Sequence, residues 1–300
     1  MTAAIPLPFR IGTRTVWHVR RRLQRVTVPL DRARTGDVPA LPPSDGDGYL
    51  VASLPEQALP QLLAAHGALK PFIRQRYRRF YAELDRGFDH WLGTLSSKSR
   101  STLKRKVRKL ADRSGGALDL RCYRTAAEAE EFYRHARAVS ALTYQERLLR
   151  AGLPEGEAAL AAMQALATRD AMRGWILFLD ARPVAYLYAP ADGETLIYAH
   201  LGYDPDHADL SPGSVLQFEA MRELMEEGRF RLFDFTEGEG QHKRLFSTGE
   251  VECVDLLLLK RTPANLLAGW SLAAFDGGIE AAKAVLKRFN LESLARRFRR

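Results

Sequence analysis

Acidic and basic side chains gather in one glycine-rich stretch of the chain. Two carboxylates, Asp234 and Glu237, precede the imidazole of His242 and the ammonium group of Lys243. A carboxylate or imidazole that is partly shielded from water can act as a general base near neutral pH. A lysine can hold a phosphate or carboxylate. These four residues are therefore candidate catalytic residues, although Asp234, which follows an apolar run, could equally be a structural cap of the loop.

A second candidate site is a helix start with the sequence Ser-Pro-Gly-Ser-Val. Serine followed by proline is typical of the first positions of a helix. The free N–H groups and the helix dipole at such a start attract anions, and a glycine lets a phosphate approach the backbone. The candidate cofactor-binding residues are Ser211, Pro212, Gly213, Ser214 and Val215. An ordinary capped helix would have the same sequence features.

Three isolated side chains complete the candidate set as possible substrate contacts. They are Tyr144 in a helical or loop region, His200 on an apolar strand and Tyr203 at the end of that strand. The alternative for His200 is a histidine held in the sheet by one hydrogen bond. The motifs of zinc peptidases, serine hydrolases and nucleotide-phosphate loops do not occur. No cluster has metal-ligand spacing, so no metal is expected.

The elements that would position these residues follow from the apolar pattern of the second half of the chain. A helix is predicted from Pro212 to Glu227, with Gly228 as its C-cap, and residues 236–242 are predicted to form a loop. One helix between runs of strands indicates an α+β or mixed α/β fold rather than a doubly wound sheet. Strands are predicted over residues 175–179, 184–188, 195–203, 230–235 and 251–259.

The first half is less regular in pattern. Residues 1–48 are expected to be irregular because they are rich in proline, glycine and aspartate near their end. Thr125 and Glu128 form a capping box that opens a predicted helix. The predicted elements are a strand over 49–54, helices over 60–69 and 101–110, a strand over 118–123, a helix over 125–150 and a helical tail over 264–300.

The net charge of +9 is concentrated in basic segments at residues 1–35, 70–113 and 281–300. Such segments can meet nucleic acid, anionic lipid or a polyanionic cofactor, or simply be solvated helix faces. The basic amphipathic tail could lie on an anionic membrane or dock on the body of the protein. Two widely spaced cysteines favour a reducing, cytoplasmic location, and neither a signal peptide nor a membrane span is expected.

The order of these motifs resembles that of a known family. Tyr203-Asp204-Pro205, Ser211-Pro212-Gly213, a helix ending at Gly228, Phe233-Asp234-Phe235 and Gly240-Gln241-His242-Lys243 follow one another as in the GNAT N-acetyltransferases of the CelD type. That type is associated with cellulose or exopolysaccharide biosynthesis. Tyrosine is common in the family where this chain has His242, and its usual Gln/Arg-x-x-Gly-x-Gly/Ala loop is absent here.

The resemblance implies a GNAT fold, in tandem halves related to the Fem-type aminoacyl-transferases. Residues 1–113 would form a degenerate N-terminal half with a basic linker helix, residues 114–262 the acyltransferase domain, and residues 263–300 the basic tail. By position in the family, residues 211–215 would hold the pyrophosphate of acetyl-CoA or a longer acyl-CoA. The pantetheine would enter between two splayed central strands.

The leading functional hypothesis is an acyl-CoA-dependent N-acyltransferase in which an amine attacks the thioester directly. The acceptor would be an amino sugar of a surface polysaccharide, or a long-chain amine or lipid. A Fem-type transferase using aminoacyl-tRNA is the alternative enzyme, favoured by the basic segment at residues 70–113. A non-catalytic binding protein on a degenerate GNAT fold is the third hypothesis.

Overall fold

The computed structural model describes residues 2–11, 14–143, 152–238 and 240–288. The chain divides into two compact units, of which unit 1 comprises Met1–Tyr77 with Glu252–Arg300, and unit 2 comprises Arg78–Val251. These units differ from the segments 1–113, 114–262 and 263–300 expected from the sequence, because both ends of the chain enter unit 1. The assignment of a degenerate GNAT-like half to residues 1–113 stays a prediction.

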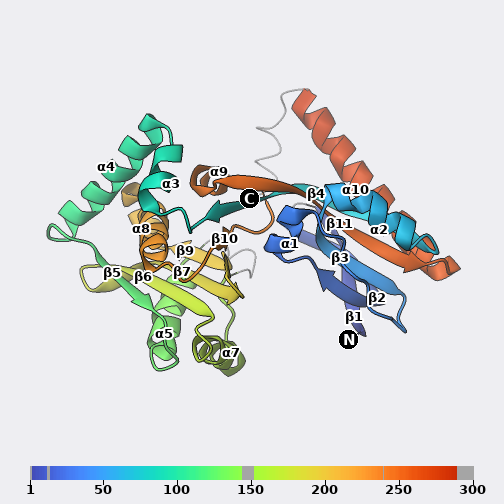
Figure 1. The fold of residues 1–300 in the computed structure, drawn as a ribbon, viewed down its shortest axis with the longest axis horizontal. Helices are drawn as coiled ribbons and strands as arrows, with labels where there is room; N and C mark the ends of the chain where they lie inside the picture. The colour runs from blue at the N-terminus through green and yellow to red at the C-terminus, as the bar shows by residue number, and fades with distance from the viewer. Residues whose placement is uncertain (1, 12–13, 144–151, 239, 289–300) are drawn as a thin grey trace. The chain divides into compact units, whose positions relative to one another are not determined.

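Unit 2 is a mixed sheet with helices packed against it (Figure 1). Its strands are the end of β4 (Leu69–Glu83), β5 (Asp119–Tyr123), β6 (Met172–Leu179), β7 (Arg182–Asp192), β8 (Thr195–Ile197), β9 (His200–Tyr203) and β10 (Leu232–Asp234). Its helices are α3 (Phe88–Thr94), α4 (Ser97–Arg113), α5 (Ala129–Ser140), α7 (Glu157–Ala167), the 3-10 helix η2 (Pro205–Leu210), α8 (Pro212–Glu227) and α9 (Gln241–Phe246).

The sheet of unit 2 has the strand order β4-β10-β8-β7-β6-β5, with β9 also paired to β7. Strands β5, β6 and β7 form an antiparallel meander, and β7 continues antiparallel to both β8 and β9. Strand β10 is parallel to β8 and antiparallel to β4, so that Phe233 lies opposite Leu196 on one side and Ala82 on the other. This mixed arrangement agrees with the predicted fold class.

Helix α8 is the central helix of unit 2, packed on β6, β7 and β9 and against α3 and α4. It is buried over most of its length, and every residue from Val215 to Met221 is buried, including the polar Gln217 and Glu219. The rings of Trp91 and Phe218 meet there at 5.9 Å between centroids. A helix held on several sides is a fixed support for any site at its first turn.

Several predictions for unit 2 are confirmed and two are wrong. The helix from residue 212 to 227 and its C-cap Gly228, in the left-handed conformation, are as predicted. The capping box forms, since Glu128 Oε2 accepts a hydrogen bond from the backbone N–H of Thr125 (2.9 Å), although α5 itself begins at Ala129. The predicted strand 195–203 is two strands, and the predicted loop 236–242 runs into helix α9.

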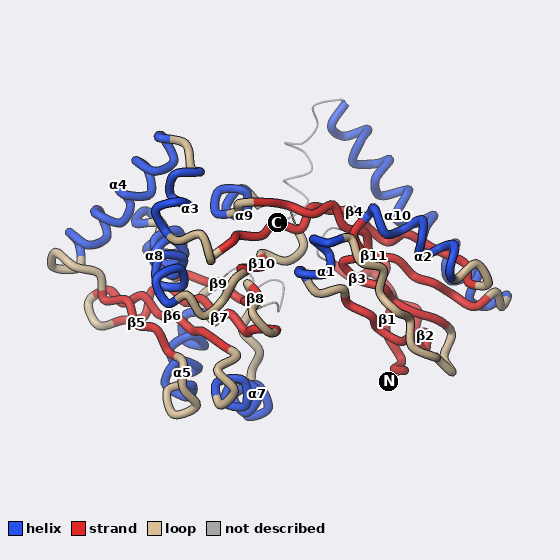
Figure 2. Tube along the Cα trace, in the orientation of Figure 1, coloured by secondary structure: helices blue, strands red, loops and turns tan. Residues whose placement is uncertain are grey.

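The strands of unit 1 are hydrogen-bonded in the order β1-β2-β3-β11, followed by the first part of β4 (Figure 2). Strands β1 and β2 form an antiparallel hairpin, β2 is parallel to β3, and β3 is antiparallel to β11. Its elements are β1 (Thr2–Ile11), β2 (Arg14–Thr27), α1 (Leu30–Thr35), β3 (Gly48–Pro55), the 3-10 helix η1 (Glu56–Ala58), α2 (Leu59–Ala65), β11 (Gly249–Lys260) and α10 (Pro263–Arg288).

The prediction that residues 1–48 are irregular is wrong, because this segment holds the long strands β1 and β2. Leu7, Phe9 and Leu23 fall on one face of these strands, where they join a core with Leu272 of α10. Arginines and prolines stand among the apolar residues, which hides the period of two. Strand β4 was missed for the same reason.

Candidate functional site

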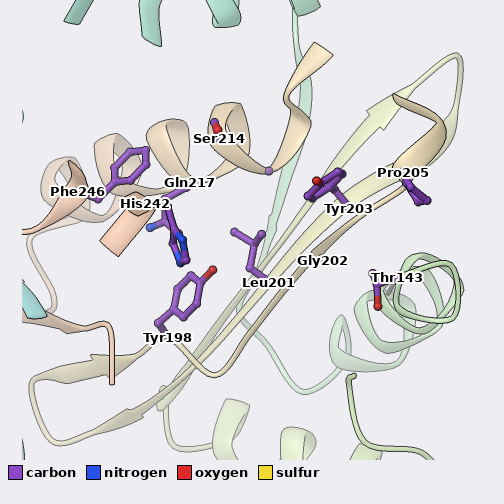
Figure 3. Close-up of a pocket in the computed structure, with 11 residues that line it drawn as sticks. Thr143, Tyr198, Leu201, Gly202, Tyr203, Pro205, Ser214, Gln217, His242 and Phe246 are labelled. Atoms are coloured by element: carbon purple, nitrogen blue, oxygen red, sulfur yellow. The ribbon is translucent and has the colours of Figure 1, made fainter. Parts of the chain in front are cut away.

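A cavity of about 390 Å³ opens in unit 2 next to the point where the pairing between the central strands β8 and β10 ends (Figure 3). The ladder between β8 and β10 ends at Ile197 and Asp234, after which the N–H of Tyr198 donates to the carbonyl of Asp234 (2.8 Å). The chain then turns into β9, which in the described residues pairs with β7 alone. Alternate amides on the other edge of β9 therefore point toward the cavity side.

The cavity is walled by β9, the first turns of α8 and helix α9. Leu201 and Tyr198 supply its apolar floor, and Phe246 closes one end. Gly202 in β9 has no room for a side chain, because a Cβ there would lie 2.5 Å from the ring of Tyr186 and 2.9 Å from the methyl group of Thr143. A mostly apolar cleft with a few polar groups is the usual form of a small-molecule site.

Gln217 is the most informative of the polar groups that line the cavity. Its side chain is only 2% exposed, yet neither its amide nitrogen nor its amide oxygen has a hydrogen-bond partner within the described part of the chain. A buried amide without partners costs about 1–3 kcal/mol for each unmet group. Gln217 can regain both bonds from a ligand that offers a donor and an acceptor side by side.

The five predicted phosphate-binding residues lie at the start of α8, but they do not all reach the cavity. Gly213 and Ser214 line it, whereas Pro212 and Val215 are buried in the packing of the helix. Ser211 is the N-cap, with a left-handed φ of 54° and no capping bond from its side chain.

The sequence predicted that Gly213 lets a phosphate approach the backbone, but in the structure this glycine is required by packing. A Cβ at this position would lie 3.2 Å from the side chains of both Leu201 and Tyr203. The glycine therefore lets the first turn of α8 lie close to β9, which brings the N–H groups of that turn to the cavity rim.

Two lysines of α4 lie beside the start of α8. Lys106 Nζ donates to the hydroxyl of Ser214 (3.2 Å), and Lys109 Nζ donates to the carbonyl of Asp209 (2.9 Å) while pairing with its carboxylate (3.1 Å). Positive side chains thus add to the positive end of the helix dipole. The rim of the cavity at Ser214 is a favourable place for an anionic group.

His242 and Tyr198 stand next to each other at the end of the cavity away from Pro205 and Thr143 (Figure 3). Their ring centroids are 5.9 Å apart, and the imidazole packs over Gly240, where a Cβ would collide with it at 2.7 Å. Partial burial, aided by the charge of Lys243, lowers the pKa of His242. Burial raises the pKa of Tyr198, so near neutral pH this pair is a neutral imidazole beside a protonated phenol.

Asp234 is buried at the end of β10 and does not line the cavity. Arg79 of β4 donates from Nε to both of its carboxylate oxygens (3.1 and 3.2 Å) and from Nη2 to one of them (2.5 Å). The N–H of Thr236 also donates to it, at 2.8 Å. With both oxygens occupied and 1% exposure, this carboxylate has the partners of a structural anchor.

The other two predicted catalytic residues flank the site rather than line it. Lys243 donates from Nζ to the backbone carbonyl of Glu237, which ties the start of α9 to the preceding loop. Burial lowers the pKa of Lys243, against the opposing influence of the nearby carboxylates. The side chain of Glu237 is exposed. Of the four residues predicted to be catalytic, His242 is the one that lines the cavity.

The predicted substrate residues have three different positions. Tyr203 lines the cavity and is 41% exposed. His200 packs its ring on Tyr188 at 6.4 Å, outside the cavity lining, and burial lowers its pKa. Tyr144 lies outside the described residues.

Sequence reasoning missed Gln217 and Tyr198. A signal for Gln217 was available, because it is a neutral polar residue within the apolar run of α8, three residues after Ser214. Tyr198 lay within a predicted continuous strand, and the break between β8 and β9 that exposes it left no clear mark in the residue pattern.

Two general features of the described residues concern membranes and metals. None of their helices combines the length and apolar character needed to cross a bilayer. No three His, Cys, Asp or Glu side chains among them are grouped so that they could hold a metal ion.

Residues 97–244, which contain every residue of the cavity lining except Phe246, match the family described as Acetyltransferase (GNAT) domain. The fold is a GNAT fold. FemX has a TM-score of 0.52 at 13% identity, covering 74% of each chain. The C-terminal domain of a putative lysylphosphatidylglycerol synthetase from Agrobacterium fabrum has a TM-score of 0.51 at 12% identity, covering 77% of this chain and 72% of that one.

A conserved protein of unknown function from Bacteroides thetaiotaomicron is similar to the same degree, with a TM-score of 0.51 at 14% identity over 71% of this chain and 70% of that chain. At these identities the likeness is one of fold alone. No curated protein matches the sequence. The family match and these structures agree on the GNAT fold.

Proposed function

We propose that unit 2 transfers an acyl group from acetyl-CoA or a longer acyl-CoA to an amine. The observation that carries this proposal is the buried, unpartnered amide of Gln217 in the cavity beside β9. The pantetheine arm of CoA is a narrow chain with two amide groups. Its N–H and C=O groups match the acceptor and donor that Gln217 and the free edge of β9 offer.

The start of α8 would receive the diphosphate of the same donor. Ser214 and the N–H groups around Gly213 lie at the cavity rim, and Lys106 reaches the hydroxyl of Ser214. A helix start with an adjacent lysine stabilises a phosphate by hydrogen bonds and by charge. Leu201 and Phe246 would exclude water from the part of the cavity between this rim and His242.

His242 and Tyr198 have the protonation states that direct acyl transfer needs. The donor supplies a thioester, whose C–S bond breaks as the new C–N bond forms. His242, neutral because its pKa is lowered, would take the proton from the attacking amine. Tyr198, which keeps its proton, would give it to the departing sulfur. The amide edge of β9 would stabilise negative charge on the carbonyl oxygen.

The proposal gives no direct contact with the reacting groups to the other three predicted catalytic residues, Asp234, Glu237 and Lys243. They would hold the elements that carry His242 in place. Arg79 and Asp234 fix the end of β10, from which the loop to His242 departs. Lys243 holds the first turn of α9 to the carbonyl of Glu237. We assign these three to positioning rather than to proton transfer.

The acceptor is proposed from the resemblance to the CelD type and from the open side of the cavity at Tyr203 and Pro205. An amino sugar of a surface polysaccharide is the first candidate and a long-chain amine or lipid the second. The chain has two cysteines, Cys122 and Cys253, far apart in the sequence, and such sparse use of cysteine favours a reducing, cytoplasmic location.

Thermal denaturation of the purified chain with CoA, acetyl-CoA, a long-chain acyl-CoA and bulk tRNA tests the proposal. A ligand at a hundred times its dissociation constant stabilises the native state by about 2.7 kcal/mol, which is readily measured. We expect stabilisation by a CoA compound that does not depend steeply on salt. No response to any CoA compound would contradict the proposal.

A Fem-type transferase that uses aminoacyl-tRNA is the second candidate, and helix α4 favours it. The helix carries eight lysines and arginines in seventeen residues, with Lys106 and Lys109 beside the cavity rim. A phosphodiester backbone would be held by such a face, with an affinity that falls steeply as salt rises. Stabilisation by tRNA that is lost at high salt, with none by CoA, would favour this candidate.

A further inference from the structure

In unit 1, helix α10 exposes an uncharged face to the solvent. In the first turns of α10, Leu267 is 70% exposed and Trp270 is 56% exposed. Ala273 and Ala274 on the same side are also exposed. The charged residue of this stretch, Asp276, is turned toward the sheet and paired with Arg74 at 3.4 Å. Large exposed apolar side chains grouped on a helix mark an interaction surface.

The hairpin of β1 and β2 extends this surface. Arg21 Nη2 donates to the carbonyl of Ala264 (2.7 Å), which fixes the start of α10 on β2. About three turns on, Phe275 packs against Phe9 (5.2 Å between centroids), and Phe9 stacks on Trp17 (5.5 Å). Helix α10 therefore runs along β2 toward the hairpin tip, where Trp17 is 64% exposed.

Ile11 and Val16 at the same tip are 54% and 58% exposed. Together with Trp17, Leu267, Trp270, Ala273 and Ala274 they form what is called here the α10–hairpin face. Tryptophan is the side chain that prefers the boundary between water and lipid, because its ring is apolar and its N–H is polar.

The charge of unit 1 indicates what covers this face. Unit 1 contains twenty lysines and arginines against ten aspartates and glutamates, whereas unit 2 contains twenty-five against twenty-six. The first thirty residues hold six arginines and no acidic residue, and Arg10 near the hairpin tip is exposed. A second copy of the chain would bring two strongly positive units together, whereas an anionic bilayer would attract the face.

We infer that the α10–hairpin face binds the surface of an anionic bilayer. Trp17, Leu267 and Trp270 enter the interfacial layer while Arg10 near the tip contacts the headgroups. Binding that combines apolar insertion with charge depends on both the anionic lipid and the exposed aromatic residues. The inference is independent of the reaction proposed for unit 2.

Tryptophan fluorescence of the full chain with vesicles tests this inference directly. The chain has four tryptophans, and Trp91 and Trp175 are fully buried in unit 2. A blue shift on adding vesicles therefore reports Trp17 and Trp270. We expect the shift with vesicles of phosphatidylcholine and phosphatidylglycerol in equal parts, and not with phosphatidylcholine alone.

The double variant Trp17→Ser/Trp270→Ser should bind phosphatidylglycerol vesicles at least about tenfold more weakly in a flotation assay, since two inserted side chains are lost. Leu142→Ser is the matched control, because Leu142 is an apolar side chain of unit 2 with 42% exposure. Circular dichroism establishes that each variant folds. Three results would overturn the inference: equal binding to both vesicle types, unchanged binding of the double variant, or a blue shift caused by self-association without lipid.

Discussion

Arg79 and Asp234 form a buried ion pair between neighbouring strands of unit 2, at the point where β10 ends and the loop to His242 begins. Arg79 is 7% exposed and Asp234 is 1% exposed, and the guanidinium contacts both carboxylate oxygens. Removing one partner of such a pair leaves a buried charge uncompensated, whereas replacing both is often nearly neutral. The pair therefore yields a test that separates structure from chemistry.

Asp234→Asn should lower the free energy of unfolding by about 3–5 kcal/mol, since Arg79 keeps its buried charge. Urea denaturation measures this loss. The double variant Arg79→Met/Asp234→Leu should regain most of it and retain acyl transfer. A stable Asp234→Asn protein with greatly reduced turnover would instead make Asp234 a catalytic residue.

His242→Ala should lower kcat by about 10²- to 10⁴-fold, the usual contribution of a general base. For the unaltered chain, kcat/KM should rise with pH through the pKa of His242, which burial and Lys243 hold below the ordinary value of 6.5. Lys243→Gln removes a positive charge that disfavours the imidazolium. The pKa of His242 then rises, so the acid limb of the profile should move to higher pH.

The Lys243→Gln profile also tests the assignment of Lys243 itself. Lys98→Gln is the control, because Lys98 is an exposed lysine of unit 2 that does not line the cavity. An acid limb that stays in place in Lys243→Gln, or that persists in His242→Ala, would exclude His242 as the base.

Gln217→Leu should stabilise the ligand-free protein by about 1 kcal/mol, because it removes a buried amide without partners and keeps a similar volume. The same change should abolish most of the thermal stabilisation by CoA. Gln164→Leu serves as the control, since Gln164 is a half-buried glutamine of α7 outside the cavity lining. Full CoA binding by Gln217→Leu would remove the principal support for the proposed function.

Gly202→Ala should destabilise unit 2 by about 1–3 kcal/mol, the usual result of overpacking. A Cβ at this position would lie 2.5 Å from the ring of Tyr186. Gly93→Ala, in helix α3, has no atom within 4 Å of the added Cβ and should be neutral or slightly stabilising. Thermal unfolding of the two variants compares them, and equal melting temperatures would show that β9 can shift to make room.

The sequence was sufficient where periodicity and capping act locally. The start of α8 at Pro212, its end at Gly228 and the capping box at Thr125 and Glu128 all depend on residues a few positions apart. The cavity depends instead on where a ladder stops. Residues 195–203 have one apolar pattern throughout. Ile197 is separated from His200 only by pairing, since β8 pairs with both β7 and β10 whereas β9 pairs with β7.

The roles of single polar residues were harder to predict than their neighbourhood. Asp234 and His242 were both predicted as catalytic residues, and of the two His242 lines the cavity whereas Asp234 does not. Which of them reaches the cavity depends on Arg79, a residue of distant β4 that occupies the carboxylate and has no sequence link to it. A partner more than a hundred positions away leaves no trace in local spacing.

Unit 1 is assembled from the two ends of the chain, whereas unit 2 is one uninterrupted segment between them. The nascent polypeptide therefore contains all of unit 2 before residues 252–260, which supply the strand that pairs with β3, have been synthesised. Until then, β3 lacks its partner β11 and has an open edge. This edge must not pair with other strands while the chain is still bound to the ribosome. A fragment ending at residue 113 would carry the same open edge permanently.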